Sequence, residues 1–162
     1  MSQSRQDLVA EIGLAMQRYQ RSVQAFDDAV GVHLGLGPAD LRCLDWLADG
    51  PKTAGQLSTA TGLSPASTTA LIDRLARKGF VERVRSETDR RQVLVRMTPA
   101  GQERTWAVYG PLVQEGVGTM ADLSDHELTV MRDHLDVIRD LTDRHRAALR
   151  GGASSGNPET AQ

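Results

Sequence analysis

Apolar residues recur at steps of three and four along much of this chain, and that spacing predicts amphipathic helices. Over residues 6–30 the steps come close to a heptad seam, formed by Leu8, Ile12, Met16, Tyr19, Val23, Phe26 and Val30. Near the other end, a capping box of Ser124 and Glu127 precedes a second stripe of Leu128, Met131, Leu135 and Ile138. A long helix with one apolar stripe needs another surface to cover that stripe.

Glycine and proline divide the rest of the chain into shorter elements. A loop is expected over residues 33–37, and a helix over residues 38–49 should follow it. A further helix is expected over residues 99–120, with Thr98 as its cap. Pro111 lies inside this helix, where its missing N–H removes one backbone hydrogen bond and should bend the helix.

The clearest start and stop signals lie between residues 53 and 98. Thr53 and Gln56 form a capping box for a short helix over residues 54–60. A turn containing glycine follows, and Ser64 with Pro65 then begins a second helix that should stop at Gly79. The apolar stripe of this second helix consists of Thr68, Leu71, Ile72 and Leu75.

Two alternating segments come directly after that helix. Residues 80–85 and 92–97 each show the period-two pattern of a strand, and the polar residues 86–89 between them favour a turn. We therefore expect a two-stranded hairpin with Arg90 and Arg91 at its tip. An arginine at the end of such a ribbon can enter a narrow, electronegative DNA minor groove.

A helix, a turn, a second helix and a hairpin together favour DNA binding, with the second helix in the major groove. The residues that point away from the apolar stripe are Pro65, Ser67, Thr69, Ala70 and Asp73. Small hydroxyl and methyl groups at the start of this helix suit a close approach to base edges. Taken alone, this helix would more simply present an ordinary solvated face. The hairpin next to it shifts the interpretation toward DNA.

The charge is distributed unevenly along the chain. The formal net charge is −2 and the isoelectric point is near 6.1, which would ordinarily argue against a nucleic-acid partner. Residues 52–104, however, carry ten basic and five acidic side chains, so this segment is at +5 and the remainder at −7. A basic segment within an acidic chain is the electrostatic pattern expected of a specific DNA-binding protein.

The run LSPASTTALIDRLARKGFVERVRSETDRRQVLVRMTPAG resembles the winged helix-turn-helix of the MarR (multiple antibiotic resistance) regulators. Asp89-Arg90-Arg91 matches the D-x-R motif of the family's hairpin, which is called the wing. The resemblance implies a single MarR-like chain over residues 1–162, mainly α with a small β-hairpin. The winged part would occupy residues 38–98, the helices that form a homodimer residues 5–30 and 99–149, and a disordered tail residues 150–162.

The resemblance also implies roles for individual residues on double-stranded DNA. Arg91 is expected in the minor groove, with Arg90 as the alternative and Asp89 fixing the direction of the arginine. Arg74 and Arg77 are assigned to the DNA backbone or to bracing the wing, and a structural salt bridge is the alternative for both. The expected major-groove contacts are Ser64, Pro65, Ser67 and Thr69.

Family members respond to a small molecule or an oxidant, commonly a lipophilic or aromatic anion held between the dimer helices and the DNA-reading part. The residues of this chain that could line such a pocket are His33, Trp46, Trp106 and Tyr109, and core packing is the alternative for each. The terminal helices likewise have an alternative, which is packing within their own subunit. If they form a two-fold dimer instead, its operator should be a pseudo-palindrome.

The sequence favours no catalytic or metal site and no cofactor. Three histidines of the last helix, His126, His134 and His145, have no partner histidine at the i, i+4 spacing, and there is no cysteine cluster or glycine-rich phosphate loop. The single Cys43 lies between Leu41 and Leu44, where burial would make the thiol inert. We therefore expect core packing for Cys43, with redox sensing as the alternative.

The N-terminal residues lack the apolar core of a signal peptide, and no run approaches the length of a membrane span. We expect a cytoplasmic DNA-binding transcriptional regulator, most often a repressor, that is not an enzyme. Two other functions stay open: a redox-responsive regulator acting through Cys43, and a winged-helix module for protein interaction.

Overall fold

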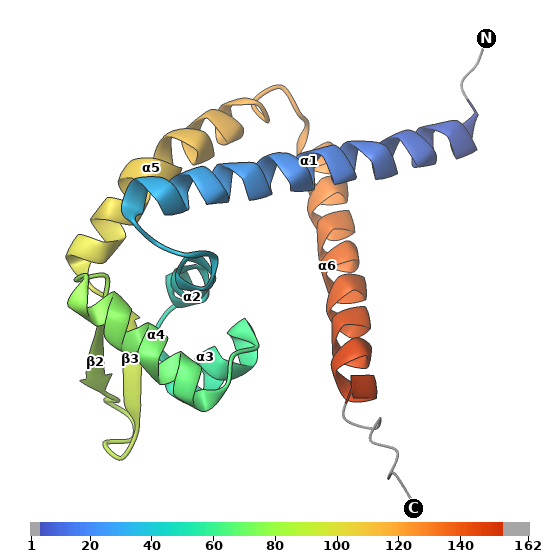
Figure 1. Cartoon of the computed structure of the whole chain (residues 1–162). Helices are drawn as coiled ribbons and strands as arrows, with labels where there is room; N and C mark the ends of the chain where they lie inside the picture. Colours follow the sequence, from blue (N-terminus) through green and yellow to red (C-terminus); the bar gives the residue numbers. More distant parts are fainter. Residues whose placement is uncertain (1–3, 154–162) are drawn as a thin grey trace, which may run out of the picture. The chain divides into compact units, whose positions relative to one another are not determined.

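The computed structural model describes residues 4–153, with side chains up to residue 149, and is mainly helical (Figure 1). The described residues fall into two compact units, and the boundary between them lies within one helix, between Gly110 and Pro111. The predicted fold class is confirmed. In chain order the elements are α1 (Arg5–Leu34), α2 (Pro38–Ala48), β1 (Lys52–Thr53), α3 (Ala54–Thr61), α4 (Pro65–Arg77), β2 (Val81–Arg85), β3 (Val93–Met97), α5 (Pro99–Gly118) and α6 (Asp125–Ala153).

The predicted capping boxes are present at two helix starts. At α3, Thr53 Oγ1 accepts the N–H of Gln56 at 3.1 Å, and Gln56 Oε1 accepts the N–H of Thr53 at 2.8 Å. At α6, Ser124 and Glu127 exchange the same pair of bonds at 3.3 Å and 2.8 Å. Each box satisfies backbone donors that have no partner inside the helix.

The first helix is longer than predicted. The sequence predicts a loop over residues 33–37, but α1 continues to Leu34 and ends at Gly35, which has a positive φ of 66°. Gly31 does not end the helix because it serves another purpose: a Cβ there would lie 2.8 Å from the carbonyl oxygen of Leu36. The chain folds back over Gly31, and the N–H of Leu36 donates to the Gly31 carbonyl at 2.8 Å.

The predicted hairpin is confirmed, and the sheet has one strand more. Strands β2 and β3 pair antiparallel, with Val81 opposite Met97 and Arg85 opposite Val93. The two residues of β1 add to the other side of β3, so the strand order is β1-β3-β2. A two-residue strand is too short to show an alternating pattern, which explains why the sequence did not reveal it.

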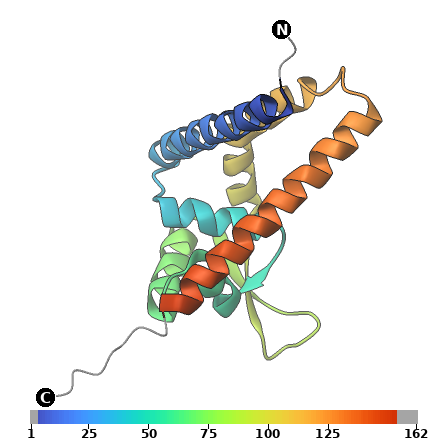
Figure 2. The ribbon, with the colours of Figure 1, turned by 90° about the vertical axis from the view of Figure 1, so that its right-hand side faces the viewer.

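Residues 38–97, the elements α2 to β3, form a closed core that we call the head. Helices α2, α3 and α4 contact one another and the sheet, and Figure 2 shows the loop between β2 and β3 extending away from them. The predicted stripe of α4 is fully within this core. The head side chains that are at most 3% exposed and apolar are Cys43, Leu44, Leu47, Leu57, Leu71, Ile72, Leu75, Phe80, Val81 and Val95.

Gly101 fixes the junction between the head and α5. A Cβ at Gly101 would lie 2.3 Å from the carbonyl oxygen of Phe80 and 2.8 Å from its Cα, so only glycine allows this approach. Thr98 supports the same junction, because its Oγ1 accepts the N–H of Gly101 at 2.9 Å and donates to the carbonyl of Gly79 at 2.7 Å. Together with the predicted cap, this contact sets the start of α5.

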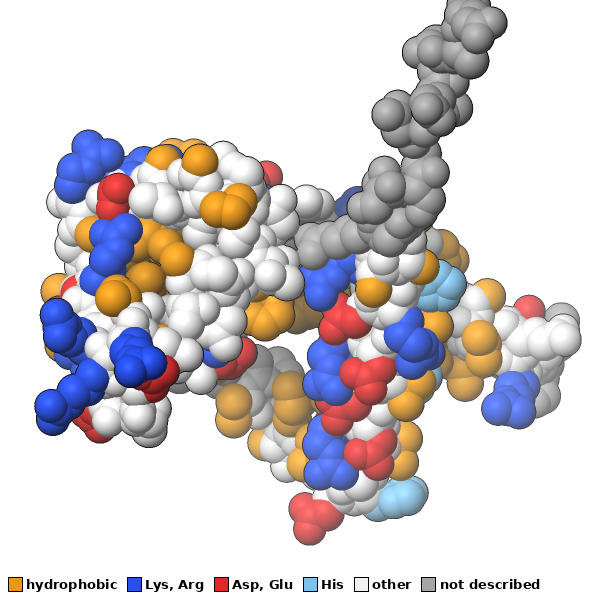
Figure 3. Space-filling view, turned by 90° about the horizontal axis from the view of Figure 1, so that it is seen from below, with side chains coloured by type: hydrophobic (Ala, Val, Ile, Leu, Met, Phe, Trp, Pro, Cys, Tyr) orange, Lys and Arg blue, Asp and Glu red, His pale blue; other side chains and the backbone are white. Residues whose placement is uncertain are grey.

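The second unit consists of the end of α5, from Pro111, and of α6. No side chain described in α6 is buried, and its ion pairs are local ones such as Arg139 with Asp136 at 2.7 Å. Figure 3 shows acidic and basic side chains in a column along α6 with hydrophobic ones beside them. Residues 150–153, which the sequence analysis placed in a disordered tail, continue α6, and residues 154–162 lie outside the described residues.

Candidate nucleic-acid interface

Helix α4 has one buried side and one fully exposed side. Thr68, Leu71, Ile72 and Leu75 are at most 2% exposed and hold the helix against the head. The four predicted major-groove residues all lie at the start of the helix and are all exposed: Ser64, Pro65, Ser67 and Thr69. The structure therefore brings them together at one end of α4, where a recognition helix contacts base edges.

Two further residues of this surface were missing from the predicted contacts. Ala66 and Ala70 are exposed, and at roughly 100° per residue they project from the side of α4 opposite the buried stripe. Ala70 was predicted to point away from the stripe, and the same helical spacing could have identified Ala66. Alanine has no polar group to draw attention to it, which is why neither residue was predicted as a contact.

Arg74 forms the salt bridge that the sequence analysis held as an alternative. Its Nη2 and Nε donate to Asp40 Oδ1 at 2.5 Å and 3.2 Å, and the Asp40 side chain is only 3% exposed. Asp40 Oδ2 also accepts the N–H of Gly37 at 3.0 Å and so caps α2. The hydrogen bond to Asp40 raises the pKa of Arg74. This pair joins α2 to α4 and so fixes the position of α4 within the head.

A different arginine braces the wing. Arg83 on β2 reaches across to Asp73 on α4, with its Nη2 2.7 Å from Asp73 Oδ1. Arg77 is exposed, and its Nε donates to the backbone carbonyl of Asp73 at 3.4 Å. From the sequence, Arg74 and Arg77 were the candidates for bracing the wing, and Arg83 was not predicted. No spacing rule connects a residue of a strand with a residue of a helix, so the pair of Arg83 and Asp73 could not be seen in the sequence.

The loop of the wing is held by a buried serine. Ser86 Oγ accepts the N–H groups of Thr88 and Asp89 at 3.3 Å and 3.2 Å, and Asp89 Oδ1 accepts the backbone N–H of Arg91 at 3.0 Å. Asp89 therefore fixes the turn of the backbone from which Arg91 projects. The guanidinium groups of Arg90 and Arg91 are exposed.

The C-terminal end of α4 is tied to both neighbouring long helices. The Lys78 ammonium donates to the Gly35 carbonyl at the end of α1. From α5, Arg104 donates to the Lys78 carbonyl at 3.0 Å, and its guanidinium lies 4.0 Å from the ring centre of Phe80. A shift of α1 or α5 would therefore move the C-terminal end of α4.

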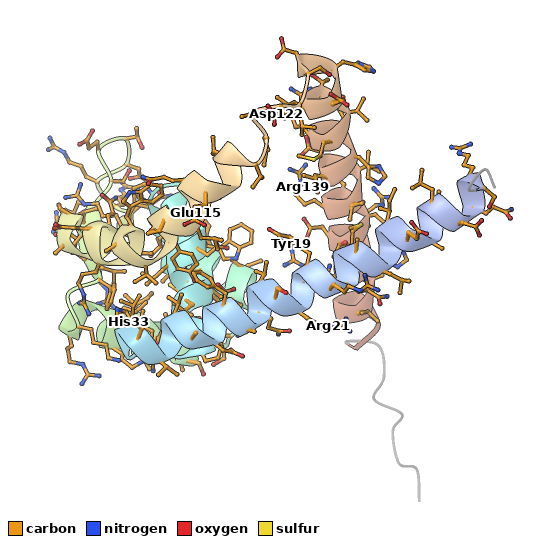
Figure 4. The ribbon with its side chains drawn as sticks, turned by 90° about the horizontal axis from the view of Figure 1, so that it is seen from above. Tyr19, Arg21, His33, Glu115, Asp122 and Arg139 are labelled. Atoms are coloured by element: carbon orange, nitrogen blue, oxygen red, sulfur yellow. The ribbon has the colours of Figure 1, made fainter. Side chains whose placement is uncertain are left out.

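The four pocket candidates differ in exposure and contacts. The Tyr109 hydroxyl donates to Asp27 at 2.8 Å, and the Tyr109 ring meets Phe26 edge to face at 5.6 Å. Burial and then the bond to Asp27 raise the pKa of Tyr109. Trp46 and Trp106 are 36% and 55% exposed. His33 is exposed near the C-terminal end of α1 (Figure 4).

Cys43 is fully buried in the head, as predicted. Burial, and then the negative charge of Asp40, raise the pKa of the Cys43 thiol to about 12. At neutral pH the thiol is therefore protonated, and a thiol is a poor nucleophile compared with a thiolate. The structure thus favours the core-packing interpretation of this residue over redox sensing.

Among the described residues, no group of three or more His, Cys, Asp or Glu side chains is placed to hold a metal ion. In the same part of the chain, no helix is long and apolar enough to cross a membrane.

A helix-turn-helix that exposes the start of its second helix, joined to a hairpin with arginines at its tip, defines a winged helix-turn-helix DNA-binding protein. A sequence model of the MarR family matches residues 34–92. The uncharacterized helix-turn-helix transcriptional regulator YcgE of Bacillus subtilis is 32% identical over 126 residues, which cover 77% of this chain and 82% of that protein. The chain belongs to the MarR family of DNA-binding transcriptional regulators, which are not enzymes.

Solved structures have the same fold. A MarR family protein from Bacillus stearothermophilus superimposes with a TM-score of 0.63 at 24% identity, over 87% of this chain and 99% of that one. A MepR variant from S. aureus, bound to an oligodeoxyribonucleotide, superimposes with a TM-score of 0.53 at 16% identity, over 81% and 97% of the two chains.

Proposed function

We propose that this regulator acts as a homodimer that represses transcription from a pseudo-palindromic operator and responds to a small effector. One observation carries the proposal: the head closes its own core, whereas apolar residues of the stripes of α1, up to Val23, and of α6 stay exposed in the single chain. On α1, Leu8, Ile12 and Val23 are 37–49% exposed, and on α6 Leu135 is 56% exposed. Covering these stripes by a second copy would remove apolar surface from water.

Two-fold symmetry gives the operator its geometry. The two recognition helices of such a dimer enter successive major grooves about 34–36 Å apart, one turn of DNA. In this arrangement Ser64, Pro65, Ser67 and Thr69 contact the major groove. The S. aureus MepR structure contains an oligodeoxyribonucleotide, which supports the use of this fold on DNA.

Arginines provide the remaining contacts. Arg91 enters the minor groove, Arg90 is the alternative, and Asp89 holds the backbone turn between β2 and β3. Arg77, on α4, contacts a phosphate of the DNA backbone. Arg74 has committed one edge of its guanidinium to Asp40, so its share of phosphate binding is the smaller one. Phosphate contacts release counterions, and affinity should therefore fall as salt rises.

The proposed effector is a small aromatic or lipophilic molecule that binds in the first unit, beside Tyr109 and Trp46. Asp45, next to Trp46, has its pKa raised by burial first and then by the nearby carboxylates of Asp49 and Asp27. This acidic surrounding disfavours an anion beside Tyr109 and favours a neutral or cationic molecule. Because α1 and α5 hold the end of α4 through Lys78 and Arg104, a ligand that shifts these helices changes the fit to DNA.

Two other functions are less well supported. Redox sensing through Cys43 would need a reactive thiol, and burial keeps this one protonated. A Cys43→Ser variant with an unchanged oxidant response would eliminate it. A winged-helix module for protein interaction would favour a neutral or acidic face, whereas residues 52–104 carry a net charge of +5.

The proposal is tested by titrating the purified protein against labelled DNA from the region upstream of its own gene. Binding is measured at two salt concentrations with random DNA as competitor. Tight binding that resists the competitor and weakens with salt supports a specific regulator, and the same assay then screens neutral, cationic and anionic aromatic compounds. Binding no tighter than to random DNA, across the flanking regions as well, would contradict the proposal.

The wing is tested by Arg91→Ala in the same assay. We expect affinity for the operator to fall about tenfold, because a charged contact is lost, with no change in the dimer or in Tm. Arg144→Ala on α6 is the matched control and should bind as the wild type does. Equal affinity of the wild type and Arg91→Ala would remove the wing arginine from the proposed interface.

A further inference from the structure

We propose that the head selects thymines through their C5-methyl groups, and that Ala66, Thr69 and Ala70 make these contacts. The inference rests on the proposed function, because it takes α4 to lie in the major groove. It adds that the operator must present thymines to α4 in that groove.

The outer side of α4 near its start is a surface of methyl groups. The buried side is defined by Thr68, Leu71, Ile72 and Leu75. With roughly 100° between successive residues, Ala66 and Ala70 stand opposite that side and Thr69 stands next to them. All three are exposed, so a DNA groove that contacts this side of the first two turns of α4 contacts methyl groups.

The hydroxyl hydrogens around this surface are largely committed within the protein. Thr69 Oγ1 donates to the Pro65 carbonyl at 3.0 Å, which turns its hydrogen back along the helix. Ser64 Oγ accepts the N–H of Ser67 at 3.2 Å and donates to Ser67 Oγ at 2.9 Å. Of these three hydroxyls, the Ser67 hydrogen is the one left to reach a base.

The side chains that read other bases are missing from the first two turns. Guanine is read by Arg or Lys and adenine by Asn or Gln, in each case through two hydrogen bonds, and residues 65–72 contain none of these types. The next polar residue on the outer face, Asp73, is held by Arg83 at 2.7 Å. Apart from the Ser67 hydroxyl, what remains is apolar contact with the thymine methyl group, which Ala and the Thr methyl are suited to make.

The experiment replaces thymine by deoxyuridine, which pairs identically and lacks only the C5-methyl group. Duplexes are first selected from a random pool by the full-length protein, and each thymine of the enriched half-site is then replaced singly. We expect about a fourfold loss of affinity for each contacted thymine, the loss that follows from one unburied methyl group. The minor-groove surface is unchanged by this replacement, so the wing contacts serve as an internal control.

Two variants at one exposed position assign the contact to the protein. Thr69→Ser keeps the hydroxyl and removes the γ-methyl; we expect about fourfold weaker binding and no further loss when the thymine facing residue 69 becomes deoxyuridine. Thr69→Val keeps the methyl and removes the hydroxyl, so this variant should still lose about fourfold when the thymine facing residue 69 becomes deoxyuridine.

The possible failures are distinguishable. If a sequence is enriched but deoxyuridine at every thymine leaves affinity unchanged, methyl readout is refuted and the proposed function stands. If no sequence is enriched at all, the proposed function fails and this inference fails with it.

Discussion

The head and helix α6 have similar apolar periodicity but bury it differently. In the head, Leu57, Ile72 and Leu75 are completely buried by other parts of the same chain. In the stripe of α6, Met131 and Leu135 are 38% and 56% exposed. An apolar stripe therefore predicts that a surface will be covered, but it does not identify what covers it. The head covers its own apolar stripes, and we propose that a second copy of the chain covers the stripe of α6.

Their ion pairs differ in the same way. The head joins distant residues, such as Arg74 with Asp40, 34 positions away, and so fixes one element on another. Along α6 the pairs join residues no more than three positions apart, such as Arg146 with Asp143. Local pairs on an exposed helix stabilise that helix only slightly. The head thus carries its tertiary structure within one chain, whereas the ion pairs along α6 support only the helix itself.

The largest effect should come from emptying the core of the head. Leu75→Ala removes a fully buried side chain and should lower the free energy of unfolding by about 2–5 kcal/mol. Leu14→Ala is the matched control, because Leu14 is 51% exposed and lies off the apolar seam of α1; we expect a change within about 0.5 kcal/mol. Urea unfolding measures both, and equal losses would contradict the distinction between covered and uncovered apolar residues.

Breaking the long-range ion pair should cost nearly as much. Asp40→Ala removes the charged hydrogen bonds to Arg74 and the cap at the start of α2, so we expect a loss of about 3 kcal/mol in unfolding free energy. Asp136→Ala breaks a local pair on α6 and should leave the unfolding midpoint unchanged. A stable Asp40→Ala variant would show that the pair does not hold α4 on the head.

The proposed interface is tested by a charge in the stripe of α6. Leu135→Asp removes an apolar side chain from the interface and should raise the Kd of the dimer about 100-fold, measured by sedimentation equilibrium. Thr129→Asp on the charged side of the same helix is the control and should leave the dimer intact. An unchanged dimer in Leu135→Asp would place the interface elsewhere.

The smallest effect concerns α1, whose C-terminal half contacts α5 within the first unit. Tyr109→Phe deletes the bond to Asp27 and should lower the free energy of unfolding by about 1 kcal/mol, whereas Tyr19→Phe, at a residue 71% exposed, should not. Because the pKa of Tyr109 is raised in the folded chain, its contribution persists below the ordinary tyrosine pKa and is lost as pH rises above about 10. Tyr109→Phe should weaken this dependence, which unfolding curves at several pH values measure.

Local signals in the sequence predicted much of the fold. Capping at Thr53 and Ser124, the stripe of α4 and the alternation of β2 and β3 all depend on residues a few positions apart, and the structure contains each of them. The end of α1 was misplaced because two glycines lie close together, and only the fold shows that Gly31 serves a close approach while Gly35 ends the helix.

The candidate site was predicted less completely. Arg74 stood between a phosphate contact and a salt bridge because its partner, Asp40, lies 34 residues away and no spacing rule connects them. Arg83 was missed for the same reason, since it meets Asp73 through tertiary structure alone. Ala66 was missed because its role, if it contacts thymine, comes from having no polar group at all.

The central claim, that two heads of one dimer read successive grooves, is tested most directly by changing the spacing of the operator. Affinity is measured for the selected operator and for versions with 5 and 10 base pairs inserted between the half-sites. About 10 base pairs make one turn of DNA, so an insertion of 5 turns one half-site to the opposite side of the helix. We predict that this insertion reduces affinity to that of a single half-site. Undiminished binding to the operator with 5 inserted base pairs would contradict the claim.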